Sequence, residues 1–453
     1  MAELSVAHRA ALAQIVAACP ERALAQLAPA VATLPGARAA ALSLMIEEEA
    51  RDRRRRAAAF RPLLPLFQAR ADGVPGLSFP AGVLPRVWQI ASLKEPALLP
   101  HLDREGAEAA AVADRICLAA AAAVRDQADL VWPVGIDPAG RDKGLEALAG
   151  AFDLAHLARR ALPSLPAWIG RPDGDQIAEL RLLMRDSAAI SPDGAQQMLE
   201  MLFAHVGDAA LILRVVTQTS GVAGREAFLS ESEMAVFVDR LIGAVHARVA
   251  RIAGFQPSAG MAALTRLKDD IAWCSGVLGE LDVTVQVRPN SVWGKDACDA
   301  RVKVAAQVSG LLRMVDKAID RVLPTTRLQL AGRMTRQVPR LDAPVAGEAV
   351  EAATVLLALT GAIRSAAGQF GCEADRAKLV AALTERLSAH ADQALELVNA
   401  GDVQDEPHAL ALIELVASFL TLIQADDAAR TVRRRAAVAG SNPDRAGASP
   451  QAA

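Results

Sequence analysis

Residues 290–324, NSVWGKDACDARVKVAAQVSGLLRMVDKAIDRVLP, are the stretch that most clearly decides the fold class. Asn290 or Ser291 can accept hydrogen bonds from the first free amides of a helix. Pro324 has no N–H with which to continue a helix, and its ring clashes with the preceding turn. The segment therefore predicts one long helix that starts after Asn290 or Ser291 and runs to Leu323.

The composition of the whole chain favours the same structure. Of its 453 residues 52% are hydrophobic and 22% charged, which is the range of folded proteins rather than disordered ones. Aromatic residues make up only 3%, tyrosine is absent, and Ala and Leu are strong helix formers. We expect an all-α fold of irregular bundles of long antiparallel helices, with at most one short two-stranded ribbon.

Helical periodicity recurs along most of the sequence, without a fixed repeat that would indicate a solenoid. The expected helices, apart from those before residue 37, cover residues 37–62, 103–130, 144–160, 175–189, 192–206, 208–219, 233–253, 258–281, 291–323, 347–369, 373–399 and 406–438.

Proline-rich breaks suggest how the helices are grouped. Residues 72–100 hold five prolines and Trp88, which predicts a connector packed through its tryptophan, and residues 162–174 form a second break. We expect an N-terminal domain at 1–165, a central bundle at 166–340, a C-terminal segment at 341–438 packed on that bundle, and a disordered tail at 439–453.

One segment departs from the helical pattern. In LDVTVQVR, residues 281–288, three valines alternate with polar residues, the period of two expected of a half-buried strand. Residues 326–332, TRLQLAG, alternate in the same way. Since an isolated strand is not stable, the two segments either pair as a ribbon or, as we favour, are extended connectors.

The most basic part of the chain adjoins these segments. Residues 321–340 contain no acidic residue, while Arg301 and Lys303 lie nearby in the sequence. Guanidinium groups bind carboxylate and phosphate through two parallel hydrogen bonds. The alternative is that these arginines pair with acids on adjacent helices or remain solvated. The candidate anion-binding or partner-binding residues are Arg288, Lys295, Arg321, Arg327, Arg333, Arg336 and Arg340.

A second basic run, MIEEEARDRRRRAAAF at 45–60, has a simpler interpretation. Acid and base recur four residues apart, as Glu47 to Arg51, Glu49 to Arg53 and Asp52 to Arg56. With the acid N-terminal to the base, this order favours ion pairs along one helix. We expect an exposed helix face stabilised by these pairs rather than a nucleic-acid patch.

Motifs for catalysis and cofactor binding are missing from the sequence. It lacks the phosphate-binding loop, the dinucleotide fingerprint and the nucleophile elbow. Asp316-x-x-x-Asp320 and Asp269-Asp270 could in principle hold magnesium diphosphate, as in isoprenoid synthases, but neither pair extends into the fuller motif of that family. No cofactor or metal is expected.

Cysteine spacing and hydropathy point to a protein inside the cell. The five cysteines are widely spaced with no C-x-x-C pair, which predicts free and mostly buried thiols in a reducing cytoplasm. The most apolar windows, at 353–363 and 409–423, are shorter than the ~20 residues that a membrane span needs. We expect no membrane span.

These observations favour a non-enzymatic adaptor, scaffold or regulatory protein that binds a protein partner or a second copy of itself. Two alternatives stay open: a helical enzyme that acts on a phosphate-bearing small molecule with Mg²⁺, and a nucleic-acid or anion binder that uses residues 321–340. The net charge of −3 disfavours the nucleic-acid alternative.

Overall fold

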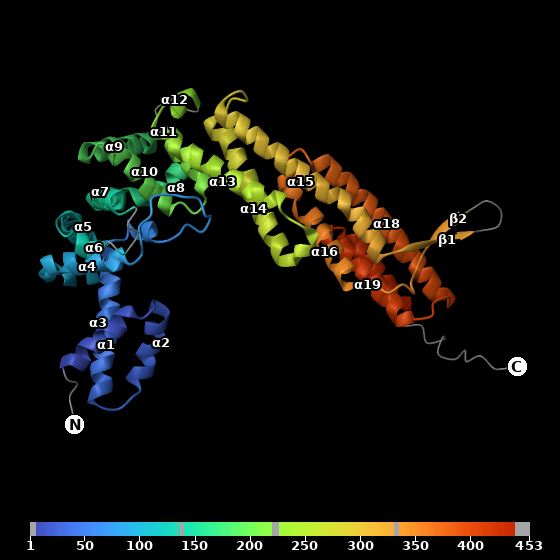
Figure 1. The fold of residues 1–453 in the computed structure, drawn as a ribbon, viewed down its shortest axis with the longest axis horizontal. Coiled ribbons are helices and arrows are strands. Elements are labelled where there is room, and N and C mark those ends of the chain that lie inside the picture. Colours follow the sequence, from blue (N-terminus) through green and yellow to red (C-terminus); the bar gives the residue numbers. More distant parts are fainter. Residues whose placement is uncertain (1–5, 134, 136–139, 220–225, 330–334, 440–453) are drawn as a thin grey trace. The chain divides into compact units, whose positions relative to one another are not determined.

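The computed structural model describes residues 6–133, 135, 140–219, 226–329 and 335–439. These residues are overwhelmingly helical, and the strands among them form a single two-stranded antiparallel sheet, so the all-α prediction is confirmed (Figure 1). The chain forms two compact units, Met1–Ala223 with Ala227–Ala235, and Gly224–Glu226 with Val236–Ala453. The expected division at residues 165 and 340 stays a prediction, because compactness does not test which segments fold independently.

The first unit is a bundle of mostly short helices. Their bounds are α1 (Val6–Ala18), α2 (Glu21–Ala32), α3 (Ala37–Ala59), η1 (Leu64–Phe67), α4 (Val83–Lys94), η2 (Pro96–Asp103), α5 (Ala107–Asp126), α6 (Ala128–Val131), α7 (Arg141–Ala161), η3 (Leu162–Ser164), α8 (Leu165–Ile169), α9 (Gly174–Ile190), α10 (Gly194–His205), η4 (Ala209–Leu211) and α11 (Ile212–Thr219).

An aromatic cluster lies at the centre of the first unit. Phe60 packs edge to face against Trp88 at 5.6 Å and against Phe152 at 4.9 Å between ring centroids. Trp88 is buried as expected, but it lies in a helix, α4, rather than in a loop-rich connector. Small buried side chains on α5 and α7, such as Ala120 and Ala155, let these two helices pack side by side.

The second unit contains the longest helices. The chain passes from the first unit to the second through α12 (Glu226–Ser230) and the start of α13 (Ala235–Ala253). The elements that follow are η5 (Pro257–Ala259), α14 (Gly260–Glu280), η6 (Leu281–Val285), α15 (Val292–Val322), β1 (Thr325–Gln329), β2 (Thr335–Pro339), α16 (Gly347–Ala362), α17 (Arg364–Ala367), α18 (Glu373–Ala400), α19 (Glu406–Leu422) and α20 (Asp426–Ala439).

Helix α15 forms as its end signals predict. The hydroxyl of Ser291 accepts the backbone N–H of Gly294 at 3.0 Å, and the helix ends at Val322, two residues before Pro324. Its buried residues, including Val304, Leu311 and Val315, recur at helical spacing. They pack mainly against α16, so α15 keeps its opposite face in solvent.

The prediction that residues 281–288 are extended was wrong. Residues 281–285 form a π-helical turn, η6, in which the N–H of Gln286 donates to the carbonyl of Leu281 at 3.1 Å. Leu281 and Val285, four residues apart, are buried, whereas Val283 is 76% exposed. The buried pair therefore follows a helical spacing, and Gln286 ends the turn in the left-handed conformation with φ of 55°.

The ribbon forms from a different pairing. Strand β1 pairs with β2, which follows it directly, with Arg327 opposite Gln337 and Leu328 opposite Arg336. The segment beginning at residue 326 is thus a strand rather than a connector, and its partner is local in sequence. The expected helix at 406–438 is also divided, into α19 and α20, at Gln424, which has φ of 67°.

Candidate partner-binding face of α15

Five basic side chains follow one face of α15. At about 100° per residue they fall within an arc of about 80°, and from first to last they span about 39 Å of helix. All five are exposed, none forms an ion pair with another described residue, and Asp299 is the one acid inside the arc. We call this surface the basic face; its cations are Lys295, Lys303, Arg313, Lys317 and Arg321.

Apolar side chains lie exposed among or beside these cations. Val292 is 76%, Val302 60% and Met314 45% exposed, and all three lie within or beside the same arc. Burying such side chains against a partner would release about 25 cal/mol for each Å² of apolar surface removed from water. The basic face therefore combines charge with apolar contact area.

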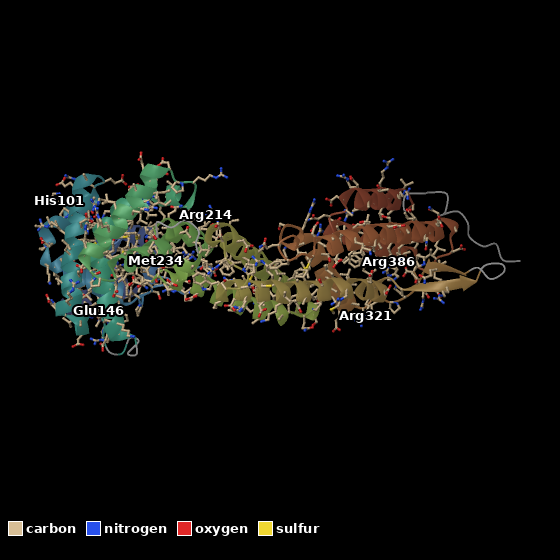
Figure 2. The ribbon with its side chains drawn as sticks, turned by 90° about the horizontal axis from the view of Figure 1, so that it is seen from above. His101, Glu146, Arg214, Met234, Arg321 and Arg386 are labelled. Atoms are coloured by element: carbon tan, nitrogen blue, oxygen red, sulfur yellow. The ribbon has the colours of Figure 1, made fainter. Side chains whose placement is uncertain are left out.

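The hairpin follows the C-terminal end of α15 and carries further exposed arginines. Arg321 lies in the last turn of the helix, close to the start of β1 (Figure 2). Arg327 is exposed on β1, and the backbone N–H of Arg340 donates to the carbonyl of Pro324 at 2.9 Å, which brings the chain back to the base of the hairpin. The guanidinium of Arg340 is 3.7 Å from the carboxylate of Asp342.

The remaining predicted residues do not all join this surface. Arg288 is held by Glu226, which lies 3.3 Å from its guanidinium. Arg301, noted as a neighbour in the sequence, forms an ion pair with Asp282 at 2.6 Å. Arg333 lies outside the described residues, and for Arg336 only the place in β2 is described.

Sequence reasoning missed Arg313 and Lys317. Both are exposed, and their spacing from Lys295, 18 and 22 residues, places them on the same face of a helix. The signal was present in the sequence, because the limits of α15 were predicted correctly. The many arginines of residues 321–340 directed the prediction to the hairpin. The helical spacing of the cations before residue 321 would have indicated the face of α15.

A small cleft lies between the base of the hairpin and α18. It has a volume of about 270 Å³, and Thr325, Gln337 and His390 are among its lining residues. Burial, and secondarily the charge of Arg386, lowers the pKa of His390 to about 4. His390 is therefore neutral at physiological pH and adds no charge to the basic face.

Both acid pairs considered for magnesium are engaged by arginines. Arg386 on α18 forms ion pairs with Asp316, at 3.3 Å, and with Asp320. Asp270 lies 2.6 Å from Arg251 and 3.5 Å from Arg248. Among the described residues no group of three or more His, Cys, Asp or Glu side chains is placed to hold a metal ion.

The state of the cysteines and the length of the apolar helices can be compared with the expectations from the sequence. All five thiols are free; Cys117, Cys274 and Cys372 are buried, Cys19 is partly buried and Cys298 is exposed. In the described part of the chain, the helices are too short or too polar to traverse a bilayer.

Comparison with known proteins adds no further assignment. No protein family model matches this chain, and no curated protein or solved structure is significantly similar to it.

Proposed function

We propose that this protein is a non-enzymatic helical adaptor that binds an acidic surface of another protein through the basic face of α15. The observation that carries the proposal is the row of five exposed cations without ion-pair partners among the described residues. A row of uncompensated charge steers a partner of opposite charge and fixes its register. Arg327 is exposed on the hairpin that follows α15 and adds a further cation near the end of the helix.

The exposed apolar residues favour a protein partner over a nucleic acid. Phosphate backbones are bound by cations and gain little from aliphatic side chains. Protein interfaces instead combine an apolar centre with a polar rim and are enriched in Met and Arg. Val292, Val302 and Met314 supply that apolar contribution.

The arginine partners of the acid pairs support a binding role over the magnesium-dependent alternative. A carboxylate that already accepts hydrogen bonds from a guanidinium must lose them before it can coordinate Mg²⁺. Asp270 and Asp320 are both in this position. The absence of catalytic motifs from the sequence points in the same direction.

The experiment uses Cys298, which is exposed on α15 close to the basic face. A photo-crosslinker attached to this thiol should capture a protein partner from an extract of the native cells. The double variant Lys303→Glu, Lys317→Glu should lose the capture, because it reverses two charges of the face. The matched control Lys268→Glu, Lys378→Glu changes two exposed lysines elsewhere in the same unit and should retain it.

Two outcomes would contradict the proposal. Crosslinking to nucleic acid that disappears on nuclease treatment, with affinity falling steeply as salt rises, would favour the nucleic-acid alternative. Capture that is equal in both double variants would show that the basic face is not the site. A crosslink to a second copy of this chain would make the partner the protein itself, and sedimentation would then show the oligomer.

A further inference from the structure

The first unit contains a cleft that the proposed function does not use. Its volume is about 1130 Å³. Its walls come from the C-terminal half of α3, the end of η2, the first turns of α5, and the junction of α7 with α8. This volume slightly exceeds the ~300–1,000 Å³ typical of small-molecule sites.

Four arginines line the cleft without an ion-pair partner among the described residues. Arg51 and Arg54 lie three residues apart on α3, Arg61 follows that helix, and Arg104 follows η2. The Glu47–Arg51 and Asp52–Arg56 pairs expected from the sequence do not form. Asp52 instead accepts the indole N–H of Trp88 at 2.8 and 2.9 Å. Of the three expected pairs, only Glu49–Arg53 forms, at 2.5 Å.

The acids of the cleft leave its charge positive. Asp103 accepts two hydrogen bonds from Arg55, at 2.8 and 2.5 Å. These bonds hold the pKa of Asp103 below its usual value, and the charges of Arg55, Arg51 and Arg54 add to the effect. Five arginines, including Arg159, line the cleft against two carboxylates, a net charge of +3.

Arg159 contributes to the walls rather than to the open side. Its guanidinium is 3.0 Å from the carboxylate of Asp114 and donates to the carbonyls of Ala58 and Ala59 at 3.2 and 2.6 Å. It thereby ties the end of α3 to α5 and α7. The four other arginines keep their hydrogen-bond donors available.

The start of α5 adds to the positive field. Glu105, Gly106 and Ala109 line the cleft, and the helix that begins there is 20 residues long. No side chain caps its first amides, since the N-cap position is Gly106, with φ of 120°. Free amides at the N-terminus of a helix favour anions. They supplement the arginines, which alone supply the net charge.

The uncharged part of the lining is aliphatic. Leu102, Ala110, Leu162 and Leu165 belong to it, together with Pro163 and Pro166, and no aromatic side chain other than the imidazole of His205 is present. The imidazole Nε2 of His205 lies 2.9 Å from the carbonyl of Pro62, so it donates there. A nucleobase would find no Phe, Tyr or Trp ring on which to stack, whereas a hydrocarbon chain fits such a wall.

We propose that this cleft binds a diphosphate ester with an aliphatic tail. The guanidinium groups of Arg51, Arg54, Arg61 and Arg104 bind the diphosphate through bidentate hydrogen bonds, and the leucine, alanine and proline wall receives the tail. A diphosphate concentrates two to three negative charges in one group, which matches the net charge of +3. An acidic peptide would spread single carboxylates over a longer distance.

The test is calorimetric titration of the full chain with three probes: geranyl diphosphate, inorganic pyrophosphate and adenosine diphosphate. Geranyl diphosphate should bind tightest, and pyrophosphate at least tenfold more weakly because it lacks the tail. The variant Arg51→Gln, Arg54→Gln should weaken both by at least tenfold. The control Arg160→Gln, Arg171→Gln removes two exposed arginines of the same unit that do not line the cleft, and should stay within twofold of wild type.

Several results would overturn the proposal. These are no binding of either geranyl diphosphate or pyrophosphate, equal binding of adenosine diphosphate and geranyl diphosphate, or an equal loss in the control variant. Thermal unfolding of each variant verifies that it is folded. The charge-reversal variant of the basic face, Lys303→Glu, Lys317→Glu, should bind geranyl diphosphate as wild type does, which separates this site from the adaptor proposal.

Discussion

The carboxylate of Glu226 accepts the backbone N–H of Arg288 at 2.8 Å, although 62 residues separate the two positions. The Glu226 side chain is buried, and the same oxygen lies 3.3 Å from the Arg288 guanidinium. This contact fixes the chain between η6 and α15, directly after Gln286 has turned it with a positive φ. The start of the helix that carries the basic face is therefore held from a distant part of the sequence.

Replacing Glu226 with alanine should lower the free energy of unfolding by about 1–3 kcal/mol, because the Arg288 N–H loses its acceptor. Glu226→Gln keeps a carbonyl oxygen in place and should cost less. The measurement is urea unfolding followed by circular dichroism. Glu231→Ala, an exposed glutamate nearby, is the control and should change stability by less than about 0.5 kcal/mol. Equal losses at both positions would show that the contact does not stabilise the fold.

This contact also explains what could be predicted from the sequence and what could not. The ends of α15 depend on local chemistry, the Ser291 hydroxyl and Pro324, so they were predictable. The conformation of residues 281–288 depends on the contact with Glu226 and on the burial of Leu281 and Val285. Neither of these tertiary contacts can be inferred from a short segment of alternating apolar and polar residues.

The two sites show the same division. Lys295 and Arg321 were predicted, and Arg313 and Lys317 could have been found from the helical period. The arginines of the first-unit cleft were not predicted, because acids and bases of residues 45–60 were expected to pair along one helix. The Glu47–Arg51 pair does not form, and Asp52 bonds to Trp88 on α4 instead of to Arg56. Local spacing predicted ion pairs along this helix, whereas Arg51 and Arg54 have no ion-pair partner among the described residues.

Two glycines should respond in opposite directions to the same substitution. A Cβ atom at Gly361 in α16 would lie 2.1 Å from the carbonyl oxygen of Leu422 at the end of α19. This oxygen belongs to the backbone, so it cannot move away without displacing the chain. Gly361→Ala should therefore lower stability by about 1–3 kcal/mol through overpacking. At Gly310 in α15 the same atom would meet nothing within 4 Å, so Gly310→Ala should raise stability by about 0.5–1 kcal/mol.

Calorimetry of the two variants beside wild type measures both changes. The pair is matched, since each replaces a helical glycine of the second unit with alanine. A gain in stability at Gly361 would mean that α16 and α19 do not approach as closely as the structure places them. A loss at Gly310 would mean that its side of α15 is covered by a partner or a second copy.

The thiols should separate into reactive and unreactive groups. Cys298 is exposed, while burial raises the pKa of both Cys117 and Cys274 to about 12. Since the thiolate is the reactive species, a maleimide should modify Cys298 at least 100-fold faster than either buried thiol at pH 7.5. Mass spectrometry of digested samples, taken over a time course, follows each site. Rapid modification of Cys117 or Cys274 in the folded protein would contradict their burial.

His390 should make the second unit less stable in acid. Its pKa is lowered to about 4 in the folded chain, first by burial and then by the charge of Arg386, against about 6.5 when unfolded. Between these two values the unfolded chain binds a proton that the folded chain does not. Stability therefore falls as the pH drops from 6.5 towards 4, and this histidine contributes no pH dependence above that window.

The variant His390→Gln removes this contribution and should flatten the pH dependence. At pH 5 the wild type should lose about 2 kcal/mol relative to pH 7.5 from His390 alone, and the variant should be spared that loss. Urea unfolding of both proteins at the two pH values gives a double difference in the free energy of unfolding. Any effect of the new glutamine on packing cancels in this difference. Equal contributions from other groups, including Asp320 and Arg386 in the same small cleft, cancel as well. A double difference near zero would mean that His390 is protonated in the folded chain at pH 5, and that the cleft beside the hairpin admits the charge.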